Sequence, residues 1–425
     1  MELPTDSIVG VISLKGTSNA HMAIVARAVE LPAIVGIENL KLDVLDGYEC
    51  ILDGNTGQFF VSPSQDQLEH YEGLIEGHKE LHEYLIADIF RPVQTKCGQP
   101  FELLSNVGVE SDAKLALSRS AQGVGLYRTE IGFMALDRFP SESEQEALYR
   151  RYFSIFHPLP VTMRTLDIGG DKALSYFPIV EANPVLGWRG LRVTLDHPEI
   201  LMIQIRAMLK ASQGLNNLRI LFPMVTEVRE LDIAIGLVNR AFHELLDEGY
   251  AHEYPSLGAM IEVPAAISQI AVFAKRVNFI SVGTNDLIQY LLAVDRNNPR
   301  VAHLFQSFHP AVLSTLEDIY LKSKAAGCEL CICGEAAGDP AMTVLLMGIG
   351  FRHFSLGPNC LLKVKWTLSQ MKLSQMEALW SKVSSLESVE SVRETVMTQL
   401  SHYGVVSGFS SPEAQRYHQR GAVAG

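Results

Sequence analysis

Short apolar runs alternate with amphipathic helical stretches from residue 95 onward. Strands that alternate with helices pair in parallel, because parallel neighbours need a crossover connection. Eight such units over about 300 residues match the count and length of a (β/α)₈ TIM barrel. We therefore predict an α/β fold of this kind, with a doubly wound sheet as the alternative. The predicted strands are Leu103–Val107, Gly123–Tyr127, Val161–Leu166, Leu218–Met224, Gly258–Val263, Asn278–Val282, Glu329–Ile332 and Arg352–Leu356.

The first ninety residues follow a different pattern. Residues 1–63 contain short β-rich runs at Ile8–Ile12, Glu49–Leu52 and Gln58–Val61 around one helical stretch, His21–Leu31. About 60 residues is small for an independent domain, so we expect a partial one. Apolar residues then recur at helical spacing from residue 64 to about 90, which predicts a linker helix, although a helix of a neighbouring domain would show the same pattern.

The chain thus divides into four predicted segments. Residues 1–63 form the partial domain, residues 64–92 the helical linker and residues 93–403 the barrel. The tail at residues 404–425 is rich in Ser, Gly and Gln, which predicts a frayed end.

Charge and composition exclude several function classes. The 425 residues include 35 Lys and Arg against 48 Asp and Glu, a net charge of −13, which disfavours a nucleic-acid binder because such binding depends on cationic side chains. No apolar run reaches the length of a bilayer span, and no charged-then-apolar leader opens the sequence. The six sparse cysteines are typical of reduced thiols. We therefore expect a cytoplasmic protein that neither enters a membrane nor binds nucleic acid.

Polar side chains follow the predicted strands where TIM-barrel enzymes place their chemistry. Any single one could be part of a solvated rim, but six chemically matched groups at strand ends predict an active site. They are Arg128 after the second strand, Arg164 in the third, Glu262 after the fifth, Asn285 and Asp286 after the sixth, and Cys333 after the seventh.

The residue types indicate phosphate chemistry. Glu262 and Asp286 are hard oxygen ligands suited to Mg²⁺, which bridges readily to substrate phosphate. Arg128 and Arg164 carry planar guanidinium groups that match phosphate oxygens, and Asn285 can donate to the same anion. Such a set stabilises the charge of a transferring phosphoryl group.

Cys333 adds a group that can exchange a proton at carbon. With Cys328 and Cys331 it could instead form a zinc cluster, but only one pair has the C-x-x-C spacing and no second pair follows. We therefore favour the catalytic interpretation.

His21 is a separate candidate in the first segment. It opens a helical stretch, and Ser18 or Asn19 can cap that helix. The positive end of a helix favours bound phosphate, so a histidine there can act as a nucleophile whose phosphorylated form is stabilised. A lone histidine near a helix start is more often structural, so the position of His21 alone does not establish it as a nucleophile.

Several motifs resemble a known family. The segments Gly16–His21 and Glu30–Gly36 resemble the phosphohistidine segment of the phosphoenolpyruvate–protein phosphotransferases, Enzyme I of the sugar phosphotransferase system. The motifs occur in family order from about residue 8 to about residue 370, and such a collinear set is highly specific. Those that resemble the family's barrel are Leu126–Glu130, Arg164–Lys172, Asn183–Arg189, Met260–Ala265, Gly283–Leu287, Ala293–Asn297 and Cys333–Glu335.

This resemblance implies a reaction and a role for each candidate. The phosphoryl group of phosphoenolpyruvate would pass to His21 and then to a small histidine-containing phosphocarrier protein, with release of pyruvate. Cys333 would protonate the enolate carbon. The family also works as a homodimer, and its phosphohistidine domain swivels between barrel and carrier. By motif, Glu262 and Asp286 would hold Mg²⁺, and Arg128, Arg164, Asn285 and Arg296 would bind phosphoenolpyruvate.

Within the family, sequence segments such as Thr194–Pro198 resemble the nitrogen-regulatory branch more closely than the sugar branch. The family's carrier-binding domain should precede Ile8 and is missing, so we expect an N-terminally truncated member. Two alternatives remain open. One is an enzyme like pyruvate phosphate dikinase, although the sequence shows no Gly-rich ATP loop. The other is a regulatory module that binds phosphoenolpyruvate without turnover.

Overall fold

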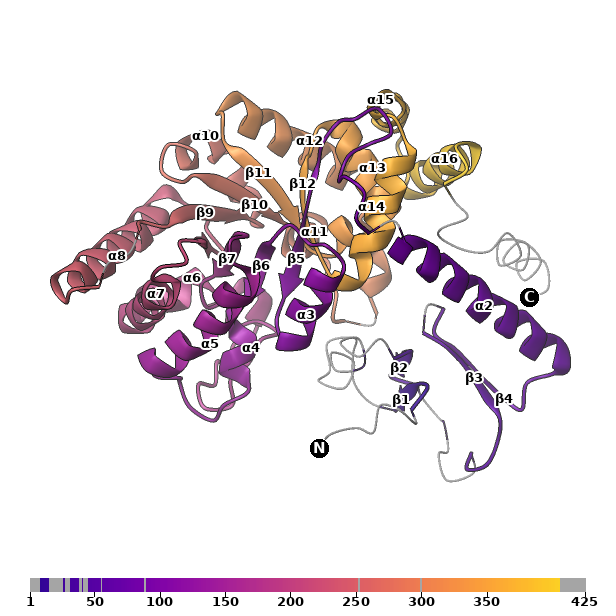
Figure 1. The fold of residues 1–425 in the computed structure, drawn as a ribbon, viewed down its shortest axis with the longest axis horizontal. Coiled ribbons are helices and arrows are strands. Elements are labelled where there is room, and N and C mark those ends of the chain that lie inside the picture. Colours follow the sequence, from indigo (N-terminus) through magenta and orange to yellow (C-terminus); the bar gives the residue numbers. More distant parts are fainter. Residues whose placement is uncertain are drawn as a thin grey trace. The chain divides into compact units, whose positions relative to one another are not determined.

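The computed structural model describes residues 8–14, 26, 31–37, 40, 45–54, 56–87, 89–250, 253–298 and 300–405. The chain divides into two compact units, with the boundary between Tyr84 and Leu85. Figure 1 shows the elements of both units.

In the described part of the first unit, two small sheets accompany a long helix. Strand β1 (Val11–Ser13) pairs in parallel with β2 (Ala33–Val35), and β3 (Cys50–Asp53) pairs antiparallel with β4 (Gln58–Val61). The hairpin strands lie close to their predicted positions, whereas β2 was not predicted as a strand. Helix α2 (Gln65–Ala87) coincides with the predicted linker helix.

Two side-chain contacts connect the helix to the hairpin. The Tyr71 hydroxyl of α2 donates to Asp53 Oδ2 over 3.4 Å, and the Tyr71 ring lies 5.9 Å from the Phe60 ring between centroids. Because α2 runs across the boundary between the units, the predicted domain limits at residues 63 and 92 stay a prediction. His21 and most of its predicted helix lie outside the described residues.

Eight parallel strands in the second unit close into a barrel, in the order β10-β11-β12-β5-β6-β7-β8-β9. The last strand pairs with the first, His353 opposite Glu102, so the sheet has no free edge and the doubly wound alternative is wrong. All eight strands were predicted to within a few residues. They are β5 (Glu102–Val107), β6 (Val124–Arg128), β7 (Val161–Arg164), β8 (Leu218–Phe222), β9 (Ser256–Ile261), β10 (Phe279–Gly283), β11 (Glu329–Cys333) and β12 (His353–Leu356).

Helices surround the strands on the outside of the barrel (Figure 1). Their bounds are α3 (Glu110–Ser118), α4 (Thr129–Met134), α5 (Glu142–Phe156), α6 (Leu191–Asp196), α7 (Pro198–Ser212), α8 (Val228–Asp247), α9 (Pro264–Ile267), α10 (Ile270–Phe273), α11 (Thr284–Leu292), α12 (Pro310–Ala325), α13 (Pro340–Ile349), α14 (Leu361–Gln370), α15 (Leu373–Val383) and α16 (Val389–His402). In the described loops lie four short 3₁₀ turns: η3 (Pro184–Leu186), η4 (Ala302–Leu304), η5 (Glu335–Gly338) and η6 (Pro358–Cys360). Within the described part of the chain, no helix is both long and apolar enough to cross a bilayer.

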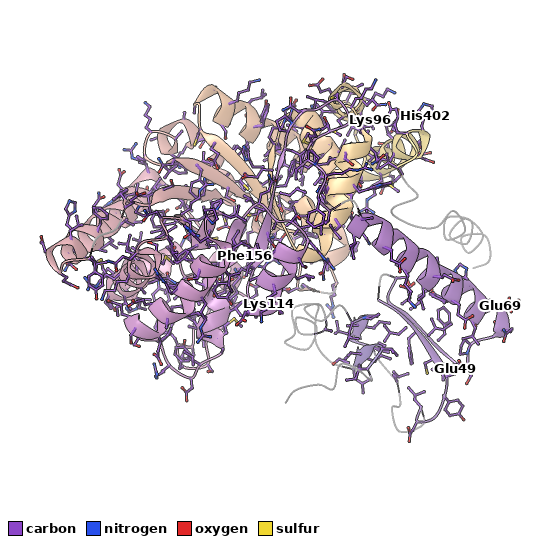
Figure 2. All side chains as sticks on the ribbon, viewed as in Figure 1. Glu49, Glu69, Lys96, Lys114, Phe156 and His402 are labelled. Atoms are coloured by element: carbon purple, nitrogen blue, oxygen red, sulfur yellow. The ribbon has the colours of Figure 1, made fainter. Side chains whose placement is uncertain are left out.

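The buried apolar side chains of the described residues form one large cluster and two smaller ones. The large cluster lies between the strands and the surrounding helices, where Phe156 of α5 is buried while Lys114 of α3 faces outward (Figure 2). A smaller cluster joins Leu126, Leu221, Met260, Phe279 and Cys333 from five different strands. The barrel is therefore a packed interior rather than a pore, which gives the strand ends a rigid base.

Charged pairs lie at the amino ends of the barrel strands. His353 Nδ1 lies 2.7 Å from Glu102 Oε2, across the seam where β12 meets β5. Arg219 lies over the Phe279 ring and pairs with Glu329 over 2.6 Å. These contacts connect strands at the end of the barrel opposite to the predicted site.

Candidate active site

The polar residues predicted from strand ends lie together at the carboxyl end of the barrel. Arg128 ends β6 and lies opposite Arg164, which ends β7. Glu262 follows β9 by one residue, Asp286 lies in the first turn of α11, and Cys333 ends β11.

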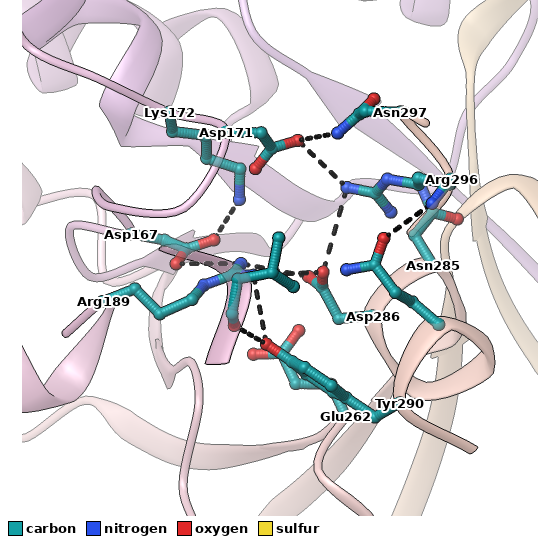
Figure 3. Close-up of polar contacts among 12 residues, drawn as sticks. Asp167, Asp171, Lys172, Arg189, Glu262, Asn285, Asp286, Tyr290, Arg296 and Asn297 are labelled. Atoms are coloured by element: carbon teal, nitrogen blue, oxygen red, sulfur yellow. Dashed lines mark hydrogen bonds and ion pairs between the residues drawn. The ribbon is translucent and has the colours of Figure 1, made fainter. Parts of the chain in front are cut away.

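These groups lie close enough together for their charges to affect one another's pKa values. Glu130 and Asp167, and to a lesser extent Glu262 and Asp286, raise the pKa of Arg164. Glu262 raises the pKa of Cys333, whereas Arg164 and Arg128 act to lower it. Figure 3 shows a network of polar contacts that links Asp286 to Arg189 and Arg296, with Glu262 and Asn285 beside it.

Asp167, which follows β7, is the most heavily paired carboxylate of this network. It is fully buried and lies 3.1 Å from Arg164 Nη1 and 3.5 Å from Arg189 Nη2, and it also pairs with Lys172. Burial acts to raise the pKa of Asp167, but the three cations outweigh it and hold the pKa well below its ordinary value. Asp167 therefore stays ionised and fixes the positions of the cations around it.

Arg189 is a member of the site to which the sequence assigned no role. Its guanidinium donates to both oxygens of Asp286, over 3.3 and 3.2 Å, and to the Tyr290 hydroxyl over 3.3 Å. Tyr290 in turn donates to the Val185 carbonyl over 2.6 Å, which ties α11 to the loop that carries Arg189 (Figure 3). Arg189 follows a loop rather than a strand. A search for polar residues at strand ends therefore did not find it, although it lies in the family motif Asn183–Arg189.

Glu130 was also missed as a site residue. It lies in the first turn of α4, directly after β6, and its Oε1 pairs with Arg164 over 2.5 Å with both side chains buried. The sequence Tyr127–Glu130 could have indicated Glu130 as a site residue. An acidic residue two positions after a strand-end arginine can turn back towards the same end of the barrel.

The two candidate metal ligands differ in their surroundings. Glu262 is buried, its Oε1 accepts from the Met224 backbone N–H over 2.6 Å, and burial raises its pKa to about 7, with the charges of Asp286 and Asp167 acting in the same direction. Burial acts on Asp286 as well, but Arg189 and Lys172 outweigh it and lower the pKa of Asp286.

Two buried carboxylates, one of which raises the pKa of the other, fit a divalent cation, whose charge would favour the ionised form of both. Mg²⁺ needs only one or two protein carboxylates, because water and substrate phosphate supply its other ligands. The donor set therefore fits Mg²⁺ in chemistry. Among the described residues no group of three or more His, Cys, Asp and Glu side chains forms a metal cage.

Cys333 is buried, with its thiol aimed at backbone and hydroxyl groups. Its Sγ donates to the Val282 carbonyl over 3.3 Å, and the Ser281 hydroxyl lies 3.5 Å from the sulfur. Burial raises the pKa of Cys333 to about 11, so the thiol carries its proton near neutral pH. Cys328 and Cys331 contact the Asn278 and Ile332 carbonyls, an arrangement that gives no support to a zinc cluster within the described part of the chain.

Asn285 and Arg296 complete the predicted set. The Asn285 Oδ1 atom accepts from the Glu335 backbone N–H over 2.9 Å, which turns the amide across the loop after β11. The Arg296 guanidinium lies 3.5 Å from Asp171 and 3.8 Å from Asp286. The Arg128 side chain is only half-buried and has no hydrogen-bond or ion-pair partner among the described residues.

Buried polar atoms without a hydrogen-bond partner concentrate in this site. Of ten such side-chain atoms among the described residues, six lie here and four are scattered elsewhere. Leaving a buried polar group unpaired costs about 1–3 kcal/mol, so a concentration of them indicates a place where a ligand supplies the missing partners. The six are Glu130 Oε2, Arg164 Nε, Thr165 Oγ1, Asp167 Oδ1, Arg189 Nε and Arg296 Nη1.

Comparison with known proteins places the chain in a family. Residues 87–373 match the PEP-binding domain of PEP-utilising enzymes, and residues 1–57 match their mobile domain. A phosphoenolpyruvate-protein phosphotransferase of Staphylococcus carnosus is 35% identical over 93% of this chain and 69% of its own length. The chain belongs to the phosphoenolpyruvate–protein phosphotransferase family.

A second member of this family is similar over a smaller share of its length. The phosphoenolpyruvate-dependent phosphotransferase system protein of Escherichia coli K12 is 42% identical over 95% of this chain and 54% of its own length. The chain thus spans about half the length of the first curated relatives that it matches. Among solved structures, a citrate lyase of Burkholderia xenovorans aligns with a TM-score of 0.40 at 12% identity over 74% of this chain and 94% of that chain.

Membership of the phosphoenolpyruvate–protein phosphotransferase family confirms the resemblance and the fold class. The roles of the individual residues stay predictions.

Proposed function

We propose that this chain catalyses phosphoryl transfer from phosphoenolpyruvate to His21, with release of pyruvate. The observation that carries the proposal is the concentration of unpaired buried polar atoms among matched acidic and basic side chains at the barrel mouth. An acidic enol phosphate supplies acceptors for guanidinium donors, and three of these six atoms are guanidinium nitrogens that lack an acceptor.

The arginines would bind the substrate. The Arg128 guanidinium has no partner among the described residues, so it can bind a phosphate or carboxylate oxygen without first breaking an ion pair. Arg164 and Arg296 each keep a buried nitrogen unpaired while pairing with carboxylates through another. Asn285 would donate to the same anion, as the sequence predicts.

The proposed transfer forms one bond to phosphorus and breaks another. The His21 imidazole nitrogen attacks phosphorus, the phosphorus–oxygen bond to the enol breaks, and the electron pair leaves on the enolate oxygen. Cys333 then gives its proton to the methylene carbon, which yields pyruvate, and the thiolate takes a proton back from water. A pKa of about 11 suits Cys333 to this acid role, because the thiol is protonated before the step and its conjugate base is readily reprotonated.

Glu262 and Asp286 would hold Mg²⁺, which when bound neutralises charge on the phosphate and enolate oxygens. Asp167 and Arg189 lie around these two carboxylates and set the local charge to which the cation would add.

Further parts of the function rest on the family and on the sequence. We propose that phospho-His21 passes its phosphoryl group to a histidine-containing phosphocarrier protein, that the barrels form a homodimer, and that the protein works in the cytoplasm. The nitrogen-regulatory branch stays our prediction for its place in the family.

The test is labelling with ³²P-phosphoenolpyruvate and Mg²⁺. We expect an acid-labile phosphohistidine on His21, stoichiometric pyruvate, and no label on His21→Ala, while calorimetry shows phosphoenolpyruvate binding within about threefold of the wild type.

Other outcomes would identify the alternatives. Binding of phosphoenolpyruvate with neither label nor pyruvate would contradict the proposal and favour a regulatory module. Label from ATP but not from phosphoenolpyruvate would favour an enzyme like pyruvate phosphate dikinase.

A further inference from the structure

The turn after β7 presents two neighbouring side chains of opposite charge to the site. Gly169 and Lys172 exchange two backbone hydrogen bonds of 3.0 and 3.1 Å, and Gly169 and Gly170 adopt φ values of +97° and +65°. A Cβ atom on Gly169 would lie 2.4 Å from the Trp188 carbonyl oxygen, so the turn is held tightly against the following loop.

Lys172 and Asp171 leave this turn towards different partners. Lys172 pairs with the buried Asp167. The Asp171 Oδ2 atom lies 3.5 Å from Arg296 Nη2 and 3.4 Å from Asn297 Nδ2, both in the segment after α11 (Figure 3). The turn thereby reaches across the site to a residue that the proposed function assigns to the substrate.

The contact of Asp171 with Arg296 is loose and partly open to solvent. Both distances are at the long end of the hydrogen-bond range, and the Asp171 and Arg296 side chains are 21% and 19% exposed. Arg296 Nη1 is buried without a partner, and Asp286 lies 3.8 Å from Nη2. Asp171 therefore satisfies only part of the Arg296 guanidinium.

We propose that Asp171 is an internal anion that occupies Arg296 and Asn297 until an acidic phosphate displaces it. The inference rests on the proposed function, because it takes Arg296 as a substrate ligand. A phosphate group carries up to two charges and three acceptor oxygens, so it can pair with both nitrogens of the fork where one carboxylate oxygen reaches only one. A weakly charged anion would therefore bind Arg296 too weakly to displace Asp171.

The same contact also acts in the reverse direction. Once the phosphoryl group has left for His21, the remaining acid has fewer oxygens to offer Arg296, and Asp171 can pair with the guanidinium again. Return of Asp171 would then assist the release of the unphosphorylated product.

A competing role for Asp171 would give the opposite result. If Asp171 served to hold Arg296 in its binding position, its removal would loosen the guanidinium and weaken substrate binding. The sign of the affinity change therefore separates an internal anion from a positioning residue.

The experiment compares the full-length wild type with Asp171→Asn, which keeps the shape and removes the charge. Calorimetry with phosphoenolpyruvate and Mg²⁺ is expected to show Kd falling about threefold to tenfold in the variant. Asp137→Asn is the matched control: Asp137 is an exposed carboxylate without a hydrogen bond or ion pair among the described residues, and the same change in net charge there should leave Kd unchanged. A Kd that is higher or unchanged in Asp171→Asn overturns the proposal.

A second measurement does not depend on the proposed function. An arginine-selective dicarbonyl reagent, read out by peptide mass spectrometry on the ligand-free protein, should modify Arg296 faster in Asp171→Asn than in the wild type or in Asp137→Asn. If the wild type fails to bind phosphoenolpyruvate but this acceleration is seen, the proposed function is wrong while the internal pairing stands. Equal labelling rates would contradict the pairing itself.

Discussion

The Cys333 thiol lies at the end of a buried strand, with its sulfur in contact with a carbonyl and a hydroxyl group. Burial keeps it protonated, while Arg164 and Arg128 oppose that effect by favouring the thiolate. These opposing influences describe a proton donor rather than a nucleophile, because a nucleophilic cysteine needs a lowered pKa.

Cys333→Ala is therefore expected to slow pyruvate formation about 100-fold or more, since a positioned acid contributes that much to a proton transfer. Binding of phosphoenolpyruvate with Mg²⁺ should change little, because the thiol is needed only after the phosphoryl group has left. Single-turnover pyruvate release and calorimetry on the same preparation measure the two effects.

Cys331→Ala is the matched control, since Cys331 lies two residues earlier on β11 and is also buried. It removes a thiol from the same strand without removing the proposed acid. Similar turnover by Cys333→Ala and the control variant would refute the assignment.

At the residue scale, strand-end reasoning from the sequence was sufficient for groups that directly follow a strand. Arg128, Glu262 and Cys333 belong to this class, and the structure brings them to one end of the barrel. Arg189 could not be found in this way, because a loop of more than twenty residues separates it from β7. Its role depends on where that loop folds, which is set by contacts such as Tyr290 with Val185 that have no local sequence pattern.

At the scale of elements, the seam between β12 and β5 carries a titratable pair. The hydrogen bond from His353 to Glu102 raises the pKa of His353 above its usual 6.5, against the effect of burial, and the Glu102 and Glu329 charges act in the same direction. Arg219 opposes them. The charged imidazole is thus favoured in the folded state.

The sign of the pH dependence follows from this raised pKa. The pair stabilises the fold fully below the unfolded-state pKa of 6.5, and this stabilisation is lost as pH rises through the higher folded-state pKa. We expect the urea midpoint of the wild type to exceed that of His353→Gln by more at about pH 6 than at about pH 9.

His243→Gln serves as the control, because His243 is exposed and has no ion-pair partner among the described residues. Its Nδ1 lies 2.7 Å from the Asn239 carbonyl oxygen, and its ring packs edge-on against Phe242. The difference of this control from the wild type should not vary with pH. A pH-independent difference for His353→Gln would show that the seam pair is not an ionic contact.

Elements were predicted well where the hydrophobic pattern is long and poorly where it is short. The barrel strands are near-continuous apolar runs, as expected for strands buried on both faces, so all eight were recognised. Strand β2 has three residues, and α9 and α10 have four each. Such segments are too short to show the repeat of apolar residues that is typical of a helix or of a strand.

At the scale of the whole molecule, the chain is built from two units with different roles in the proposed reaction. The barrel unit contains every described residue of the candidate site, and the first unit contains the sequence position of His21.

A fragment covering residues 64–410 retains α2 and the barrel. We expect it to unfold cooperatively by circular dichroism and to bind phosphoenolpyruvate with Mg²⁺ within about threefold of the full chain, but to accept no label. A fragment that folds yet binds no phosphoenolpyruvate would show that the first unit contributes to the substrate site.

Closure of the barrel by β5 and β12 has a consequence for biosynthesis. Glu102 and His353 are 251 residues apart, so at roughly 5–20 residues per second the first strand waits on the order of 10–50 s for its second neighbour. Throughout that time the nascent chain exposes an unpaired strand edge to which other chains can add. A premature stop codon anywhere before β12 would leave the sheet permanently open, and we expect even a late nonsense allele to give an aggregating product that depends on chaperones.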